Sequence, residues 1–149
     1  MKIYLDNCCF NRPYDDLSSE TVRLEAEAKI LIQSLLLNNS LELVWSFILT
    51  IENDENPYED IKNEISEWKK RATNYIPPSE STENLAQKIS DLGIKQKDAI
   101  HLSCAIEAKS MYFITTDRKL IHKARNNINE IEIINPIDFI AILEGKYEK

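Results

Sequence analysis

The chain has 149 residues, 43% of them hydrophobic and 29% charged, with a formal net charge of −7 at pH 7, so we expect a single soluble globular domain over residues 1–149. No apolar run approaches the ~20 residues that span a bilayer, and the acidic balance argues against a protein that holds nucleic acid mainly by positive charge. Three cysteines form neither a disulfide framework nor a zinc pattern, and the first residues do not resemble a secretory signal, so we expect a cytoplasmic protein without a membrane partner.

The first predicted strand is Ile3–Leu5, preceded by Lys2 and followed directly by Asp6. A carboxylate at the end of a buried strand needs a partner. In an open parallel sheet the ligand site lies at the carboxyl ends of the strands, so Asp6 is a candidate wall of such a site. The polar residues from 7 to 19 predict a loop, after which Ser18 or Ser19 is expected to cap a helix.

The next elements are a long helix and a short strand. A helical pattern covers residues 20 to 37, with Leu24, Ala28, Leu31 and Leu35 along one predicted stripe. Residues 41 to 45 predict a strand. Ser46 is then expected to cap a helix that carries Glu52 and ends before residue 57, a proline.

The second half of the chain continues the alternation of helices and strands. Gly93 is expected to close the second of its helices, and the helix that follows is apolar nearly all round and is expected to be buried. The predicted helices cover residues 58–71, 79–92, 97–109, 117–125 and 137–143, and the predicted strands cover residues 75–76, 111–115 and 131–134. This alternation predicts an α/β fold with a mainly parallel sheet. With only 2 glycines and no G-x-G-x-x-G or P-loop pattern, the sequence disfavours a dinucleotide or P-loop nucleotide site.

Acidic residues recur where predicted strands end and helices begin. Asp6 ends the first strand, and Asp117 follows the strand at residues 111–115. Asp98 begins the buried helix, and Glu52 lies on the helix after the second strand. Carboxylates gathered in one pocket raise each other's pKa unless a divalent cation neutralises them. Their oxygens suit Mg²⁺ or Mn²⁺, which activate water and shield a phosphodiester during hydrolysis.

With these acids placed, the sequence resembles the PIN-domain nucleases, the group that includes the VapC-type toxins of toxin–antitoxin pairs. The opening Ile-Tyr-Leu-Asp6-Asn is similar to that family's first acidic motif. Ser46, with Glu52 six positions later, resembles the second motif. Asp98 at the start of an alanine-containing buried helix resembles the third, and Thr-Thr-Asp117 resembles the fourth. The resemblance covers essentially the whole chain.

The resemblance implies a three-layer α/β/α fold with a central, mainly parallel sheet of four to five strands, and Mg²⁺- or Mn²⁺-dependent hydrolysis of RNA. It also implies that Asp6, Asp98 and Asp117 are catalytic metal ligands, with Glu52 as a further ligand or a water-positioning group. The implied partners are an RNA substrate, an antitoxin protein and a second copy of the chain in a homodimer. A PIN fold without nuclease activity, serving as a binding or scaffold module, is the alternative.

Five residues near these acids are expected to contact the substrate: Asn7, Arg12, Thr115, Arg118 and Lys119. Arg12 either binds a phosphate as a fork or pairs with Asp15 or Asp16. It lies in the segment from residue 8 to residue 16, which is not part of the common PIN pattern and resembles a subgroup of bacterial PIN proteins.

The helix after Asp117 carries a local positive excess from Arg118, Lys119, Lys123 and Arg125. These residues form either a solvated helix face or a phosphate-binding rim. We favour the rim, because it reconciles RNA binding with a negative net charge. His101 is expected to be a packed, hydrogen-bonded histidine rather than a metal ligand, and the adjacent pair of cysteines at 8 and 9 is expected to pack below the site.

Overall fold

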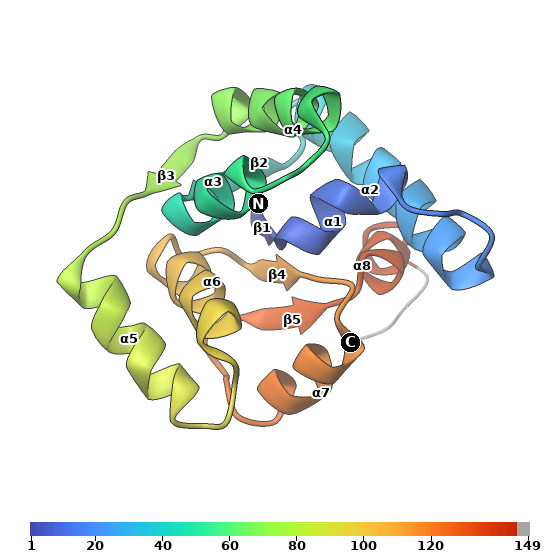
Figure 1. Ribbon diagram of the computed structural model, residues 1–149. Helices are drawn as coiled ribbons and strands as arrows, with labels where there is room; N and C mark the ends of the chain where they lie inside the picture. Colours follow the sequence, from blue (N-terminus) through green and yellow to red (C-terminus); the bar gives the residue numbers. More distant parts are fainter. Residues whose placement is uncertain (146–149) are drawn as a thin grey trace.

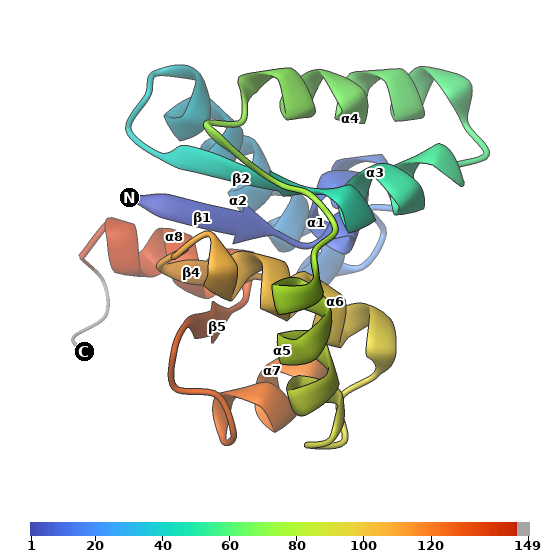
Figure 2. The same cartoon turned by 90° about the vertical axis from the view of Figure 1, so that its left-hand side faces the viewer.

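The computed structural model describes residues 1–145, which form a parallel five-stranded sheet with helices on both faces (Figures 1 and 2). The strands are β1 (Lys2–Leu5), β2 (Glu42–Ser46), β3 (Asn74–Ile76), β4 (Tyr112–Ile114) and β5 (Glu132–Ile134). Their order across the sheet is β3-β2-β1-β4-β5, and every neighbouring pair is parallel. The predicted three-layer α/β fold is confirmed.

The helices fall into two layers. They are α1 (Asn7–Asn11), α2 (Glu20–Leu37), α3 (Phe47–Asp54), α4 (Glu59–Arg71), α5 (Glu80–Ser90), α6 (Gln96–Glu107), α7 (Arg118–Arg125) and α8 (Pro136–Leu143), with a 3₁₀ helix, η1 (Arg12–Tyr14), after α1. Right-handed crossovers place α2 and α4 on one face of the sheet, where α8 joins them, and α6 and α7 on the other (Figure 1). Residues 1–145 contain no helix that is both long and apolar enough to cross a membrane.

The direction in which the sheet grows reverses between β1 and β4. From β1 the chain adds β2 and β3 on one side, and it then returns to add β4 and β5 on the other side. The helices that follow β1 and β4 therefore cover opposite faces, and a crevice opens between them at the carboxyl ends of the two strands. Asp6 directly follows β1, and Thr115 directly follows β4.

The centre of the sheet is buried on both faces, as is usual for a parallel sheet. Ile3, Tyr4 and Leu5 of β1 are fully buried, and the ring of Tyr4 stacks on Phe113 of β4 with 5.3 Å between ring centroids. The buried apolar residues of both helix layers join these strands in one cluster.

Residues that the sequence predicts at the ends of helices occupy those positions in the structure. The side chains of Ser19 and Ser46 accept hydrogen bonds at the N-termini of α2 and α3, as predicted, and Ser79 does the same for α5 without having been predicted as a cap. Gly93, beyond the end of α5, has φ +92°, a conformation that side chains with a Cβ rarely adopt. The boundaries of these helices therefore agree closely with the predicted ones.

The prediction of a loop over residues 7 to 19 is wrong in its first half. Helix α1 begins immediately after Asp6, and η1 follows it. The backbone N–H of Cys9 donates to the carbonyl of Asp6, and the ring of Phe10 packs edge-on against Trp45 with centroids 5.3 Å apart. This helix is five residues long, too short to show a periodic pattern, and it is stabilised by tertiary packing instead.

The predicted buried stripe of α2 is also wrong in part. Leu24 and Leu31 are exposed, whereas Ile32 and Leu36 are buried against the core. The buried face is rotated about one residue along the helix, because it also contains the charged side chains of Glu25 and Lys29, described below.

Candidate functional site

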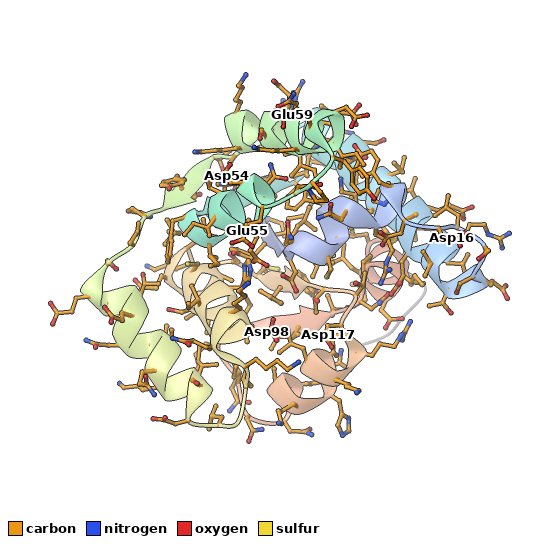
Figure 3. All side chains as sticks on the ribbon, in the orientation of Figure 1. Asp16, Asp54, Glu55, Glu59, Asp98 and Asp117 are labelled. Atoms are coloured by element: carbon orange, nitrogen blue, oxygen red, sulfur yellow. The ribbon has the colours of Figure 1, made fainter. Side chains whose placement is uncertain are left out.

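Three of the four predicted acids lie together at the crevice between β1 and β4. Asp6 follows β1, Asp117 caps α7 after β4, and Asp98 lies in the first turn of α6. Burial raises the pKa of Asp98 to about 6, and the negative charges of Asp6 and Asp117 contribute to the rise. The charges of Asp6 and Asp117 therefore act on Asp98, and Figure 3 labels Asp98 on α6 and Asp117 at the start of α7.

Thr115 orients Asp6. Its hydroxyl donates to Oδ2 of Asp6 at 2.8 Å, and the same hydroxyl accepts the backbone N–H of Asp117 at 3.1 Å. The backbone N–H of Asn7 donates to Oδ1 of Asp6 at 2.8 Å. Thr115, predicted to contact substrate, therefore connects two of the acids through its own hydrogen bonds.

The two adjacent cysteines occupy different positions. Cys9 is buried beneath the site and its thiol lies 3.3 Å from the carbonyl of Ile114, as predicted. Cys8 is only half-buried and lies in the wall of the site, with its sulfur 3.6 Å from Oδ2 of Asp6 and 3.4 Å from the hydroxyl of Thr115.

His101 connects the fourth acid, Glu52, to Asp6. It is buried and hydrogen-bonded, as predicted: Nε2 bonds to Oε1 of Glu52, and Nδ1 lies 2.6 Å from the hydroxyl of Tyr4. Nε2 also lies 3.8 Å from Oδ1 of Asp6. Burial opposes the positive form of His101, but its hydrogen bond to Glu52 and the charges of the surrounding acids outweigh burial and raise its pKa. In its protonated form, which these acids favour, His101 offsets part of the negative charge of the site.

The described residues contain no group of three or more His, Cys, Asp or Glu side chains arranged to hold a metal ion. Glu52 is bonded to His101, and Asp6 accepts hydrogen bonds from Thr115 and the backbone of Asn7. The donor set nevertheless fits Mg²⁺ or Mn²⁺ by type, because carboxylate oxygens are what these ions prefer. The repulsion that contributes to the raised pKa of Asp98 is also what a bound cation would relieve.

Arg12 is engaged in ion pairs. Its Nη1 lies 3.0 Å from Oδ2 of Asp15, which is one of the two pairings predicted for it. Its Nε lies 3.3 Å from Oε1 of Glu25, a carboxylate on α2 that is only 2% exposed. Glu25 also accepts a hydrogen bond from Asn135, and Arg118 lies 3.9 Å from it. The buried Glu25 therefore organises one side of the site around two arginines.

The positive excess of α7 is divided between two roles. Lys123 donates to the carbonyl of Gly93 at 2.9 Å, and Arg125 donates to the carbonyl of Ile133 at 2.9 Å, so both fasten α7 to its neighbours. Arg118 and Lys119 are exposed at the start of α7, beside Asp117. Of the four residues predicted to form a phosphate-binding rim, only these two therefore lie beside the acids.

Comparison with solved structures identifies proteins of the same architecture. A chain in the crystal structure of FitAcB from Neisseria gonorrhoeae aligns with a TM-score of 0.57 and 17% identity, covering 90% of this chain and 97% of that chain. A chain in the structure of VapBC2 from Rickettsia felis, bound to a DNA fragment from their promoter, aligns with a TM-score of 0.53 and 14% identity over 91% of this chain and 98% of that chain. The chain has a PIN-like fold. Comparison with protein-family models and with curated protein sequences gives no match.

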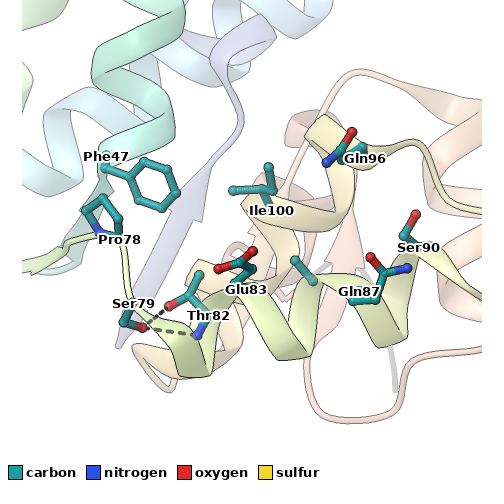
Figure 4. Close-up of a pocket in the computed structure, with 10 residues that line it drawn as sticks. Phe47, Pro78, Ser79, Thr82, Glu83, Gln87, Ser90, Gln96 and Ile100 are labelled. Atoms are coloured by element: carbon teal, nitrogen blue, oxygen red, sulfur yellow. Dashed lines mark hydrogen bonds between the residues drawn. The ribbon is translucent and has the colours of Figure 1, made fainter.

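A cavity of this PIN-like fold lies beside the acids rather than at them. It has a volume of about 700 Å³ and runs between α3, α5 and α6 (Figure 4). Phe47, Pro78 and Ile100 form its apolar end, and the polar side chains of Glu83, Gln87 and Gln96 line the remainder. It contains none of the predicted acids, although α6 contributes both to this cavity and, through Asp98, to the acidic site.

Two functional neighbours of the acids were not singled out from the sequence as part of the site. His101 was expected in the core, but the spacing of three residues between it and Asp98 is the local signal that both face one side of a helix. Glu25 offered no such signal, because a glutamate on a charged helix is usually solvated.

Proposed function

We propose that this PIN-like protein is a Mg²⁺- or Mn²⁺-dependent endoribonuclease that hydrolyses RNA phosphodiester bonds, and that it acts as the toxin of a toxin–antitoxin pair. The observation that carries the proposal is the grouping of Asp6, Asp98 and Asp117, from three different elements, at the switch-point crevice of a parallel sheet. Three carboxylates that repel one another at this position call for a cation.

In this proposal Asp6, Asp98 and Asp117 hold the metal ion. A bound ion would supply Lewis-acid chemistry for the hydrolysis of a phosphodiester by water. Thr115 fixes the orientation of Asp6 through its 2.8 Å hydrogen bond. Glu52, held in place by His101, orients the attacking water or serves as a further ligand.

The phosphates on either side of the cleaved bond are assigned to residues at the rim of the site. Arg118 and Lys119 are exposed next to Asp117 and supply positive charge there. Asn7 lies next to Asp6 and offers an amide donor. Arg12, already paired with Asp15 and Glu25, contributes mainly by holding this wall of the site and only secondarily as a phosphate ligand.

Four exposed apolar side chains on α2 support the proposed protein partners, an antitoxin or a second copy of this chain in a homodimer. Leu24, Ile30, Leu31 and Leu37 are between 39% and 51% exposed on this helix. Exposed apolar side chains such as these are available for protein–protein contacts. The toxin assignment also follows the resemblance of the four acidic motifs to VapC-type proteins, and VapBC2 is one of the structures with the same fold.

The proposal is tested by calorimetric titration of the metal-free protein with Mn²⁺, with Asp98→Asn as the site variant and Asp54→Asn as the control. Asp54 is an exposed aspartate on α3, away from the three acids. We expect the wild type and Asp54→Asn to bind Mn²⁺ and to cleave a mixed RNA, and Asp98→Asn to lose both properties.

A PIN-like binding module without nuclease activity is the second candidate. It is favoured by the hydrogen bonds that already engage Glu52 and Asp6 within the protein. Equal Mn²⁺ binding by all three proteins, or no binding by any of them with no RNA cleavage, would select this candidate over the nuclease.

A further inference from the structure

A groove adjoins the acidic site on the side opposite α7. It has a volume of about 410 Å³ and lies between the α1–η1 segment and the chain that connects α3 to α4. Glu52 of the acidic site and Asn7, which follows Asp6, are among its lining residues. The groove therefore begins where the reacting phosphodiester is proposed to lie, and its volume is in the range of small-ligand pockets.

Two tyrosines flank this groove from separate segments. Tyr14 of η1 is 42% exposed and Tyr58, directly before α4, is 64% exposed. The hydroxyl of Tyr14 bonds to Glu64 of α4, which restricts the position of the ring. Burial, together with this hydrogen bond, raises the pKa of Tyr14 to about 12, so the ring stays neutral. Exposed aromatic rings of this kind are the platforms on which proteins stack unpaired bases.

Amide groups line the same groove in a connected row. Nδ2 of Asn56 donates to Oδ1 of Asn11 at 3.1 Å, and Nδ2 of Asn11 donates to the carbonyl of Asn7 at 3.1 Å. Oδ1 of Asn56 accepts the backbone N–H of Tyr58 at 3.1 Å. These bonds fix the orientations of Asn11 and Asn56. Because each amide nitrogen carries two N–H groups, Asn56 keeps a further donor for a ligand.

The charges in the groove disfavour a phosphate between the two tyrosines, so a nucleotide that binds there places its base in the groove and its phosphate outside. The charged residues that line the groove are Glu52, Glu55 and Asp15, all negative, and no lysine or arginine lines it. A ligand that fits is therefore planar, uncharged and rich in N–H groups. The exposed carboxylate of Glu55 can accept two parallel N–H bonds (Figure 3), and among the four RNA bases guanine presents two neighbouring N–H groups, N1–H and N2–H, on its pairing edge.

We propose that the groove between Tyr14 and Tyr58 is a nucleobase subsite that binds an unpaired guanine of the RNA, stacked on tyrosine and hydrogen-bonded to Glu55 and Asn56. This subsite rests on the proposed ribonuclease function for its biological role, because it places a guanine next to the phosphodiester at the acids. It predicts cleavage of single-stranded RNA beside guanine.

Binding is tested separately from cleavage. Protein labelled in its 6 tyrosine rings is titrated, without metal, with guanosine 5′-monophosphate and in parallel with the cytidine and uridine 5′-monophosphates, and ring signals are followed by NMR. We expect the guanine nucleotide to shift the Tyr14 and Tyr58 signals at lower concentration than the pyrimidine nucleotides. Tyr58→Leu and Glu55→Gln should each weaken this binding about tenfold.

Matched controls lie outside the groove. Tyr75→Leu removes a tyrosine on β3 that is 47% exposed, and Glu59→Gln removes an exposed carboxylate at the start of α4. Both controls should bind guanosine 5′-monophosphate like the wild type. Equal binding by Tyr58→Leu and the wild type, or unmoved Tyr14 and Tyr58 signals, would overturn the subsite.

A cleavage assay on a mixed RNA separates this proposal from the nuclease proposal. We expect wild-type cuts beside guanine and a loss of that preference in Tyr58→Leu. Cleavage without any base preference, with unmoved tyrosine signals, would leave the nuclease standing and refute the subsite. Guanine binding through Tyr58 in a protein that cleaves no RNA would support the subsite and refute the nuclease.

Discussion

Replacement of Lys29 by methionine is expected to stabilise the protein at pH 7. Lys29 lies on α2, is 2% exposed, and places Nζ 5.1 Å from the ring centroid of Phe10 and 5.3 Å from that of Trp68. Burial lowers the pKa of Lys29 from 10.5 to about 8. At pH 7 the amine is therefore charged in both the folded and the unfolded chain, and the folded state bears the cost of desolvating it. Methionine keeps most of the apolar stem without the charge.

The magnitude follows from the shift in pKa. The lowering of the pKa from 10.5 to about 8 corresponds to roughly 3 kcal/mol of unfavourable free energy below pH 8. The two cation–π contacts, and a hydrogen bond of 2.6 Å to the side-chain oxygen of Gln33 with its amide turned toward the lysine, are lost in the variant. They offset about half of the gain, which leaves a net stabilisation of about 1–2 kcal/mol at pH 7.

The gain should depend on pH. Between pH 8 and pH 10.5 the unfolded chain binds a proton at Lys29 that the folded chain has lost, so the stability of the wild type rises with pH relative to a variant without this amine. The advantage of Lys29→Met should therefore fall by roughly 2–3 kcal/mol between pH 7 and pH 10, and vanish or reverse.

Urea unfolding of the wild type and Lys29→Met at pH 7 and pH 10 measures both quantities. Lys88→Met, which changes an exposed lysine on α5, is the control and should unfold like the wild type at both values. A variant that is destabilised at pH 7 by more than about 2 kcal/mol, with the same difference at pH 10, would refute the reasoning from desolvation.

Three further substitutions test other parts of the structure by the same unfolding measurement. Glu25→Ala removes the buried partner of Arg12 and should destabilise the protein by about 3 kcal/mol. The control Glu27→Ala changes an exposed glutamate on the same helix and should change stability by less than about 0.5 kcal/mol. Equal effects would mean that the buried ion pair does not contribute to stability. Asp98→Asn should stabilise the metal-free protein by about 1–2 kcal/mol at pH 7 but not at pH 4. The reason is that the raised pKa of Asp98 makes the wild type lose stability as pH rises from 3.8 to about 6. Added Mg²⁺ should stabilise the wild type more than the variant. Gly93→Ala should lower the free energy of unfolding by about 1–2 kcal/mol, because φ at this position is +92°. The new Cβ would make only ordinary contact with Lys123, so the cost comes from the backbone and not from a clash. An unchanged free energy of unfolding would show that the turn relaxes.

The order of strands and helices and most of their boundaries are determined locally by the sequence. Ser46, Ser79 and Gly93 act on backbone groups within three residues of themselves, so their effects need no knowledge of the fold. The place of Asp6 can be predicted in the same way, since a residue at the end of a parallel strand lies at the ligand-binding edge of the sheet wherever that strand is placed.

The tertiary structure decided which faces and partners these elements have. Helix α2 carries more than one apolar stripe, and the buried one is the one that lets Glu25 meet Arg12 and Lys29 meet Phe10. Helix α1 is too short for a periodic signal and exists because Phe10 packs on Trp45. His101 bonds to Glu52, 49 residues earlier in the chain. Contacts of this kind join residues far apart in the sequence, and their free energy depends on burial that only the assembled layers create.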